Sequence, residues 1–181
     1  YDLATQSAVN ILDHFLPRGG LVYDIGTSTG NISKNIKKSK EAKIIRIDNS
    51  YNIVKDSVCD NLVIADAQDF KFKEFDVAVC FLVLSFMPIK ERKEMISQLI
   101  EKKKDGGAII ILDKVFINNP QISFAERRLT TLFKRKTTED SLILDKDLSL
   151  AGIQRQLNED EFDEVGNVFF KLGEFKGWVI T

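Results

Sequence analysis

Five short, unbroken apolar runs dominate the first two thirds of this sequence. They are rich in Val, Ile and Leu, and longer segments of mixed character separate them. Continuous apolar character, without alternation of apolar and polar residues, is typical of strands that are covered on both faces, as in a parallel sheet. We therefore expect strands over residues 21–25, 44–47, 62–64, 75–83 and 108–112.

The segments between these runs carry apolar residues at helical spacing. Strands that alternate with helices indicate a doubly wound α/β fold. A turn at Asp105, Gly106 and Gly107 is expected to lead into the fifth strand. Helices are expected over residues 2–15, 30–39 and 90–103.

The last third of the chain has a different character. Two helices are expected over residues 122–136 and 149–158. Two strands over 165–170 and 175–180 then form a hairpin that turns at Gly173. The prediction is an α/β fold with a Rossmann-like, doubly wound, mostly parallel seven-stranded sheet and a C-terminal antiparallel hairpin.

Composition limits the size of the protein and its partners. With 181 residues, 44% of them hydrophobic, one sizeable core and a single domain over residues 1–181 are expected. The 26 basic and 27 acidic side chains nearly cancel, so net charge does not support nucleic-acid binding. No stretch approaches the roughly 20 apolar residues that cross a bilayer. Cys59 and Cys80 lack metal-ligand spacing, so we expect reduced thiols, no metal and a cytoplasmic protein.

A glycine-containing loop follows the first strand and gives the strongest signal for a site. Asp24 is the last residue but one of the strand, and Gly26, Thr27, Ser28 and Gly30 lie in the loop before the next helical segment. Glycine lets a backbone turn sharply and approach a ligand closely. The spacing is not G-x-G-x-x-G, which weakens a pyrophosphate-binding interpretation and favours a ligand without phosphates. The alternative is a structural turn that binds nothing.

Acidic residues follow the second and third strands. Asp48 and Asn49 come about 20 residues after the loop, at the distance where two ribose hydroxyls can donate to a carboxylate. Asp66 and Ala67 follow the third strand and offer an acceptor and a backbone donor to an adenine ring. Each acid by itself could equally cap a following helix. Their serial order favours an adenosyl ligand along the carboxyl edge of the sheet.

Several segments carry a likeness to known enzymes: Tyr23-Asp24-Ile25-Gly26, Ile47-Asp48-Asn49-Ser50, Leu84-Ser85-Phe86-Met87 with Glu91-Arg92, and Gly106-Gly107-Ala108. The chain resembles the class I S-adenosylmethionine-dependent methyltransferases, whose fold ends in an antiparallel hairpin. Within them it is similar to the carboxy-S-adenosylmethionine synthases, which use prephenate to carboxylate the cofactor for a tRNA wobble-uridine modification.

The resemblance implies S-adenosylmethionine as cofactor, or S-adenosylhomocysteine as product, and assigns contacts residue by residue. The loop would line the methionine side together with Tyr1, which lies 25 residues before the first glycine of the motif. The strand-four contact falls on Phe81, where the family has an asparagine, and core packing is the alternative role for Phe81. The implied cofactor-binding residues are Tyr1, Asp24, Gly26, Thr27, Ser28, Gly30, Asp48, Asn49, Asp66, Ala67 and Phe81.

Two departures from the family bear on the reaction. The region after Lys136 is shorter, and the arginine that holds the extra carboxylate aligns nearest to Gln156, one position from Arg155. A carboxylate on the sulfonium needs a fixed cation, for which Arg127, Arg128 and Arg155 are the candidates.

Three functions remain open. The first is methyl transfer to a small-molecule or otherwise undefined acceptor, the second is carboxy-S-adenosylmethionine synthesis, and the third is partner binding by a non-catalytic methyltransferase fold. Cys80-Phe81-Leu82-Val83 is not the Asp/Asn-Pro-Pro-aromatic motif, which disfavours methylation of DNA amino groups. No catalytic residue is assigned, and His14 is expected on a helix surface. Related enzymes often dimerise, so a homodimer is consistent with the resemblance.

Overall fold

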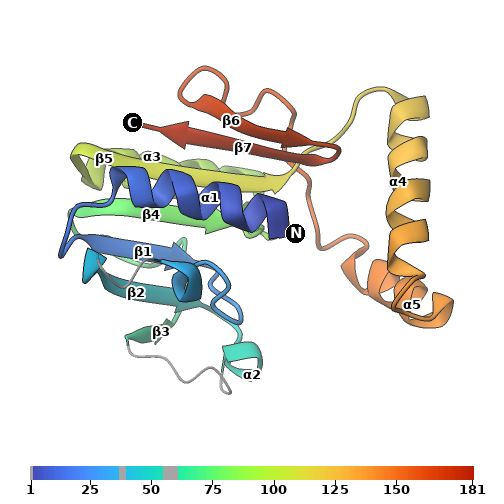
Figure 1. Cartoon of the computed structure of the whole chain (residues 1–181), viewed down its shortest axis with the longest axis horizontal. Helices are drawn as coiled ribbons and strands as arrows, with labels where there is room; N and C mark the ends of the chain where they lie inside the picture. Colours follow the sequence, from blue (N-terminus) through green and yellow to red (C-terminus); the bar gives the residue numbers. More distant parts are fainter. Residues whose placement is uncertain (1, 37–39, 55–60) are drawn as a thin grey trace.

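The fold is built on one seven-stranded sheet, shown in Figure 1. We analysed it in a computed structural model that describes residues 2–36, 40–54 and 61–181. The strands lie in the order β3-β2-β1-β4-β5-β7-β6. Their bounds are Leu21–Ile25 (β1), Lys43–Asp48 (β2), Leu62–Ile64 (β3), Phe75–Phe81 (β4), Lys103–Lys114 (β5), Asn167–Leu172 (β6) and Phe175–Ile180 (β7).

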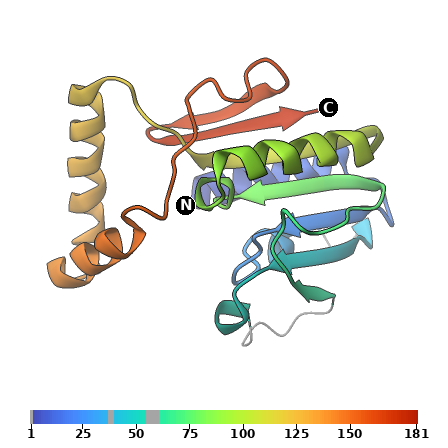
Figure 2. The same ribbon diagram turned by 180° about the vertical axis from the view of Figure 1, so that it is seen from behind.

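Helices cover both faces of the sheet. Helix α1 packs on one face against β4 and β5, and α3 packs on the other face against β5 (Figures 1 and 2). Helices α4 and α5 stand away from the sheet on the side of the carboxyl ends of the parallel strands (Figure 1). Within the described ranges, every helix is too short or too polar to cross a bilayer. The helices are Asp2–Phe15 (α1), Tyr51–Val54 (α2), Ile89–Lys102 (α3), Pro120–Lys134 (α4) and Asp140–Leu150 (α5).

The strand order explains where a ligand can bind. Strands β1 to β5 are mutually parallel, and β7 inserts antiparallel between β5 and β6. The chain runs outward from β1 through β2 to β3 and then returns to the other side of β1 as β4. The carboxyl ends of β1 and β4 therefore mark a topological switch point, where open α/β sheets bind ligands.

Burial follows from the apolar character of the strands. β1 and β4 are buried along nearly their whole length, as their unbroken apolar sequences predict. Helix α1 buries Ala4, Ala8, Val9 and Leu12, which share one helix face, against the sheet. The second core cluster lies on the opposite face and includes Trp178 of β7.

The structure confirms most expected elements and corrects four. The segment at 30–39 forms only a short 3₁₀ turn, Ser33–Asn35, with residues 37–39 outside the described residues. Residues 149–158 do not form a helix: α5 ends at Leu150, and turns follow. Residues Asp105 to Gly107 lie within β5 beside a register shift instead of in a turn before it, and β4 ends at Phe81. Cys59 lies outside the described residues.

A buried ammonium group fixes the C-terminal hairpin to the segment that precedes it. Lys176 of β7 is buried, and its Nζ donates to both carboxylate oxygens of Asp163, at 2.7 and 2.9 Å, and to the carbonyl of Glu159. The indole Nε1 of Trp178 donates to the same carboxylate at 2.6 Å. These hydrogen bonds from Lys176 and Trp178 hold the pKa of Asp163 below its usual range.

We predict that Asp163→Asn destabilises the protein by about 1–2 kcal/mol at neutral pH, because Lys176 then stays buried without a counter-charge. The loss is no larger because the partly exposed carboxylate of Asp163 is screened by water. A lowered pKa means that the stabilisation is complete above the unfolded-state pKa and is lost as pH falls through the folded-state value. Urea unfolding of both proteins from neutral to acidic pH should therefore show converging stabilities. A difference that stays constant down to acidic pH would contradict the ion-pair explanation.

Candidate functional site

The loop after β1 lies at the switch point and has a strained backbone. Gly26 and Gly30 have φ of +67° and +76°, and Ser28 between them has φ of +48°. A Cβ atom at Gly26 would come within 2.4 Å of the Val83 side chain, which follows β4. The amides of Gly26 and Thr27 donate to the carbonyl of Ile47 at the end of β2. Glycine is therefore required where the loop passes between the ends of β2 and β4.

A buried carboxylate holds this loop from below. Asp24 is 2% exposed and accepts hydrogen bonds from the Thr27 hydroxyl, at 2.8 Å, and from the Ser33 hydroxyl. Burial raises the pKa of Asp24, and the bonds from Ser33 and Thr27 and the charge of Arg46 oppose that rise. Asp24 therefore acts on the loop conformation, since its oxygens are engaged beneath it.

Arg46 supplies the positive charge of this network and was not expected from the sequence. It is paired in register with Asp24 on the neighbouring strand, is 5% exposed, and donates from Nε to Ser33 Oγ at 2.9 Å. Its Nη1 is buried without a hydrogen-bond partner among the described residues. A Cβ at Gly30 would lie 2.4 Å from Nη2, so the guanidinium fills the space under the second glycine. The sequence did offer one indication of its role, since Arg46 is a charged residue within an otherwise apolar run.

The acid after β2 contacts the loop directly. Asp48 Oδ2 accepts from the amide of Ser28 and Oδ1 from the amide of Ser50, both at 2.8 Å. Each carboxylate oxygen therefore keeps a lone pair free. The structure thus brings Asp48 against the glycine loop.

A second hydrogen bond joins the ends of β2 and β3. Asn49 Nδ2 donates to Asp66 Oδ1 at 2.6 Å, and the amide of Ala65 donates to the carbonyl of Asp48. Ala67 is half-buried against the core. The polar groups after β1, β2 and β3 consequently form one continuous row along the carboxyl edge.

Strand β4 supplies an apolar boundary to this row. Phe81 is half-buried and packs beside the α1-side core, and Leu82 after it has φ of +55°. Cys80 is fully buried, and burial raises the pKa of its thiol, so a thiolate nucleophile is disfavoured. His14 is exposed on α1, as expected. Tyr1 lies outside the described residues.

A buried network brings one of the candidate cations to the edge. The amide of Arg155 donates to the carbonyl of Ser85, which follows β4, at 2.5 Å. The Ser85 amide donates to Asp113, a fully buried carboxylate at the end of β5 whose pKa burial raises. Arg92 Nη1 donates to the carbonyl of Arg155. Among the described residues, the exposed Arg155 side chain makes a single 3.5 Å contact, to the carbonyl of Ile153.

Arg92 anchors that segment through a buried ion pair. Its Nε and Nη2 donate to both oxygens of Glu161 at 2.8 and 2.7 Å, and the two side chains are 1% and 4% exposed. The resemblance in sequence included Glu91-Arg92, but nothing in the sequence indicated that Glu161 would be the ion-pair partner of Arg92.

The other positions considered for the cation lie elsewhere. Gln156, the position that aligns nearest to the arginine of the family, donates to Glu174 and faces the β6–β7 hairpin. Arg127 and Arg128 are on α4, which stands off the sheet. Among the residues that the structure describes, no three His, Cys, Asp or Glu side chains gather as a metal site would require.

Comparisons with known proteins agree with this geometry. Residues 22–107 match the family model described as "Methyltransferase domain". The chain is 28% identical to the carboxy-S-adenosyl-L-methionine synthase of Staphylococcus epidermidis, over 90% of this chain and 79% of that protein. It is 31% identical to the synthase of the same name from Ruthia magnifica, over 62% of this chain and 52% of the relative. For several of these relatives, the chain spans only about half of the relative's length.

Solved structures agree on the fold. The chain is similar to the protein in the "DhpI-SAM-HEP complex", with a TM-score of 0.66 and 15% identity over 99% of this chain and 86% of that one. It is also similar to an S-adenosylmethionine-dependent methyltransferase from Clostridium acetobutylicum, with a TM-score of 0.65 and 11% identity over 100% and 91% of the two chains.

Residues 22–107 thus match a methyltransferase domain, and the strand order and the loop at the switch point agree with that match. The chain is similar to the carboxy-S-adenosyl-L-methionine synthases.

We predict that Arg46→Met destabilises the protein by about 1–3 kcal/mol at pH 8, because Asp24 loses its counter-charge and Ser33 a hydrogen-bond donor. Without Arg46 the pKa of Asp24 rises further. The loss should therefore shrink as pH falls and Asp24 is protonated in both proteins. Urea unfolding at pH 8 and pH 5 measures it. Arg18→Met, which breaks an exposed pair with Glu41, is the control and should change stability little. A loss that does not depend on pH would exclude the charge as its cause.

Proposed function

We propose that this chain binds S-adenosylmethionine along the carboxyl edge of β1, β2, β3 and β4 and transfers its methyl group to a small-molecule acceptor. The observation that carries the proposal is the position of Asp48. Its carboxylate is fixed by the amides of Ser28 and Ser50, and each oxygen keeps a free lone pair. Two vicinal ribose hydroxyls can donate to such a carboxylate side by side.

The remaining contacts follow from the order of the strands. Gly26, Thr27, Ser28 and Gly30 line the methionine side, with Asp24 holding the loop from beneath, and Tyr1 is assigned to the same side by the resemblance alone. Asn49 shares the ribose with Asp48. Asp66 accepts from the adenine amino group through Oδ2, since Asn49 occupies Oδ1, and Ala67 offers its amide. Phe81 packs against the ring from β4.

Methyl transfer from a sulfonium requires of the protein mainly that it position the cofactor and the acceptor. When bound, the cofactor supplies a methyl group on a positively charged sulfur. The glycine loop and Asp48 orient the ligand, and the apolar Phe81 and Leu82 exclude water from its neighbourhood. Positive charge at sulfur is lost as the methyl group leaves, so an apolar boundary favours the transfer. A general base is needed only for an acceptor that must lose a proton.

A second candidate function is carboxy-S-adenosylmethionine synthesis, which the named relatives support. A carboxylate on the sulfonium requires a nearby cation, and we assign that role to Arg155. Its backbone is fixed at Ser85 beside the end of β4, and its guanidinium makes no ion pair among the described residues. In this version of the proposal, Arg155 replaces the arginine that aligns with Gln156, and the product serves tRNA wobble-uridine modification in the cytoplasm.

We predict that Asp48→Ala weakens S-adenosylmethionine binding by about 1–3 kcal/mol, since the ribose hydroxyls and two loop amides lose their acceptor. Isothermal titration calorimetry with S-adenosylmethionine and S-adenosylhomocysteine measures the effect. Asp105→Ala, at an exposed position near the start of β5, is the matched control and should leave affinity unchanged. Equal affinities of the Asp48→Ala and wild-type proteins would refute the site.

Replacing Arg155 separates the two candidate functions. Arg155→Ala should bind S-adenosylmethionine as the wild type does, and should abolish formation of the heavier carboxylated sulfonium from prephenate, detected by mass spectrometry. Arg155→Lys should restore part of that activity, because it keeps the charge without the bidentate geometry. If the wild type consumes no prephenate but methylates an acceptor, the first function holds and the second fails.

A further inference from the structure

Arg46 is a buried cation whose hydrogen-bonding capacity is largely unused. A guanidinium offers five N–H donors. Arg46 is 5% exposed, and within the described residues its side chain makes one hydrogen bond, from Nε to Ser33 Oγ. Its Nη1 is buried and has no partner in that part of the chain. Burying a charge with so few bonds is costly, so this group calls for a physical explanation.

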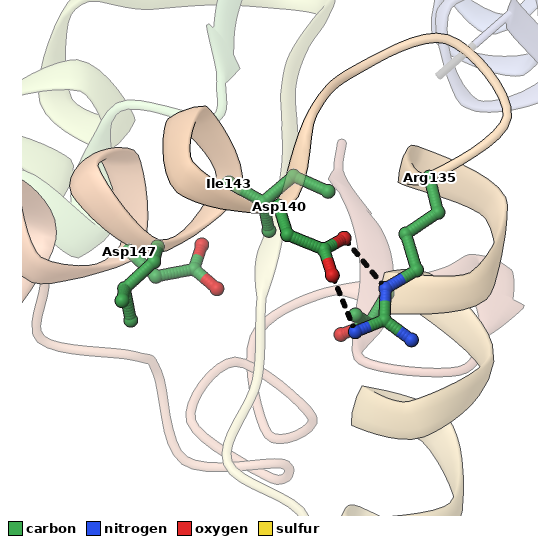
Figure 3. A pocket seen from close by; sticks show the side chains of 6 residues that line it. Arg135, Asp140, Ile143 and Asp147 are labelled. Carbon is green, nitrogen blue, oxygen red and sulfur yellow. Dashed lines mark hydrogen bonds and ion pairs between the residues drawn. The ribbon is translucent and has the colours of Figure 1, made fainter.

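Two other arginines of the chain are satisfied by carboxylates. The buried Arg92 donates to both oxygens of Glu161. In the pocket between α4 and α5, Arg135 donates to both oxygens of Asp140, at 2.7 and 2.9 Å (Figure 3). These guanidinium groups have their counter-charge within the chain. Arg46 differs from both, because its buried Nη1 meets no carboxylate oxygen among the described residues.

Asp24 does not take up this capacity. It lies opposite Arg46 in the register of β1 and β2, but the two side chains are joined through Ser33, whose hydroxyl donates to Asp24 and accepts from Nε. The same Asp24 oxygen accepts from the hydroxyl of Thr27. Asp24 therefore balances part of the charge of Arg46 across this bridge, and Nη1 is left without an acceptor.

The guanidinium lies directly beneath Gly30. A Cβ atom at this position would come within 2.4 Å of Nη2, and its three nearest neighbours would all be atoms of the guanidinium. Only the backbone of a glycine, with φ of +76°, therefore separates the positive charge from the opposite side of the loop. Thr29 and Asn31, which flank Gly30, are exposed.

The loop has two further properties of an anion-binding site. Residues 26–36 include no acidic side chain. The amides of Thr29 and Asn31, on either side of Gly30, donate to no backbone carbonyl within the described ranges, and backbone turns bind anions through such amides. The acidic residue that contacts the loop, Asp48, does so through another amide. The Gly30 side therefore combines available donors with a positive charge that is only partly balanced.

We propose that Arg46 positions the carboxylate at the amino-acid end of the ligand, attracting it from beneath Gly30 while the amides of the loop bind it directly. This inference rests on the proposed binding of S-adenosylmethionine, whose methionine portion is assigned to the same loop. The carboxylate of the ligand supplies the counter-charge that the guanidinium lacks within the described residues. Arg46 is a positioning residue that acts through the backbone of Gly30, since it does not reach the reacting atoms.

The burial of the guanidinium makes this attraction effective. Water and salt screen a surface cation, whereas protein surrounds Arg46, and charges in protein interact more strongly at the same distance. The carboxylate of Asp24 reduces the attraction but accepts no hydrogen bond from Nη1. The site therefore favours a ligand that keeps its amino-acid carboxylate over one that has lost it.

Calorimetric titration of the full chain with S-adenosylmethionine and with decarboxylated S-adenosylmethionine tests the proposal, since the two ligands differ only in this carboxylate. The wild type should bind the complete cofactor about 10-fold more tightly. Arg46→Gln can still donate to Ser33 but lacks the charge, so it should lose this preference through weaker binding of the complete cofactor alone. Arg46→Lys should retain most of the preference. A merely structural role of Arg46 would weaken both ligands equally.

Lys34→Met is the matched control, because Lys34 is an exposed cation on the segment that follows the loop and water screens its charge. Its preference for the complete cofactor should equal that of the wild type.

The outcomes separate this inference from the proposed function. A wild type that binds both ligands equally, with binding that Asp48→Ala weakens, leaves the cofactor site standing and overturns the role of Arg46 without the need for any folded Arg46 variant. An equal loss of both ligands in Arg46→Gln also overturns it. A wild type that binds neither ligand overturns the proposed function and this inference together.

Discussion

The site depends on a charge that the sheet buries. Asp24 lies near the end of β1, under the loop that follows this strand, and it is almost inaccessible to water. A carboxylate in such a place is costly unless hydrogen bonds and a counter-charge stabilise it. Thr27, Ser33 and Arg46 provide both, and the same bonds fix the loop. Stability and ligand geometry are therefore consequences of one network.

The carboxyl edge is assembled from segments that have little order of their own. Asp48 is fixed by backbone amides, Asn49 by Asp66, and the Arg155 segment by Ser85 and Arg92. Each link joins residues that are 17 or more positions apart, apart from the local bond to Ser50. Such links form only when the strands are in register. These links fix the relative positions of Asp48, Asn49 and Asp66 along the edge.

Sequence reasoning succeeded where local periodicity coincides with burial. The strands β1 to β5 were found because central parallel strands must be apolar on both faces. The hairpin was found from two short strand-like runs around Gly173. It failed at 30–39, where helical spacing yields a single 3₁₀ turn, and at 149–158, where the amides of Arg155 and Leu157 donate to the distant carbonyls of Ser85 and Lys114. Tertiary hydrogen bonds overrode local preference in the second case.

The sequence by itself determined the class of fold and the row of polar groups along one edge, because strand order and strand-end residues follow from patterns a few residues long. Arg46 beneath Gly30, the Arg92–Glu161 pair and the hydrogen bond of the Arg155 amide to Ser85 were decided only by the tertiary structure. Each of these joins residues distant in the chain, and one sequence does not specify which buried charges will meet. The exposed face of α4 has the same origin: its apolar pattern is written in the sequence, but only the folded chain shows that none of its residues is buried.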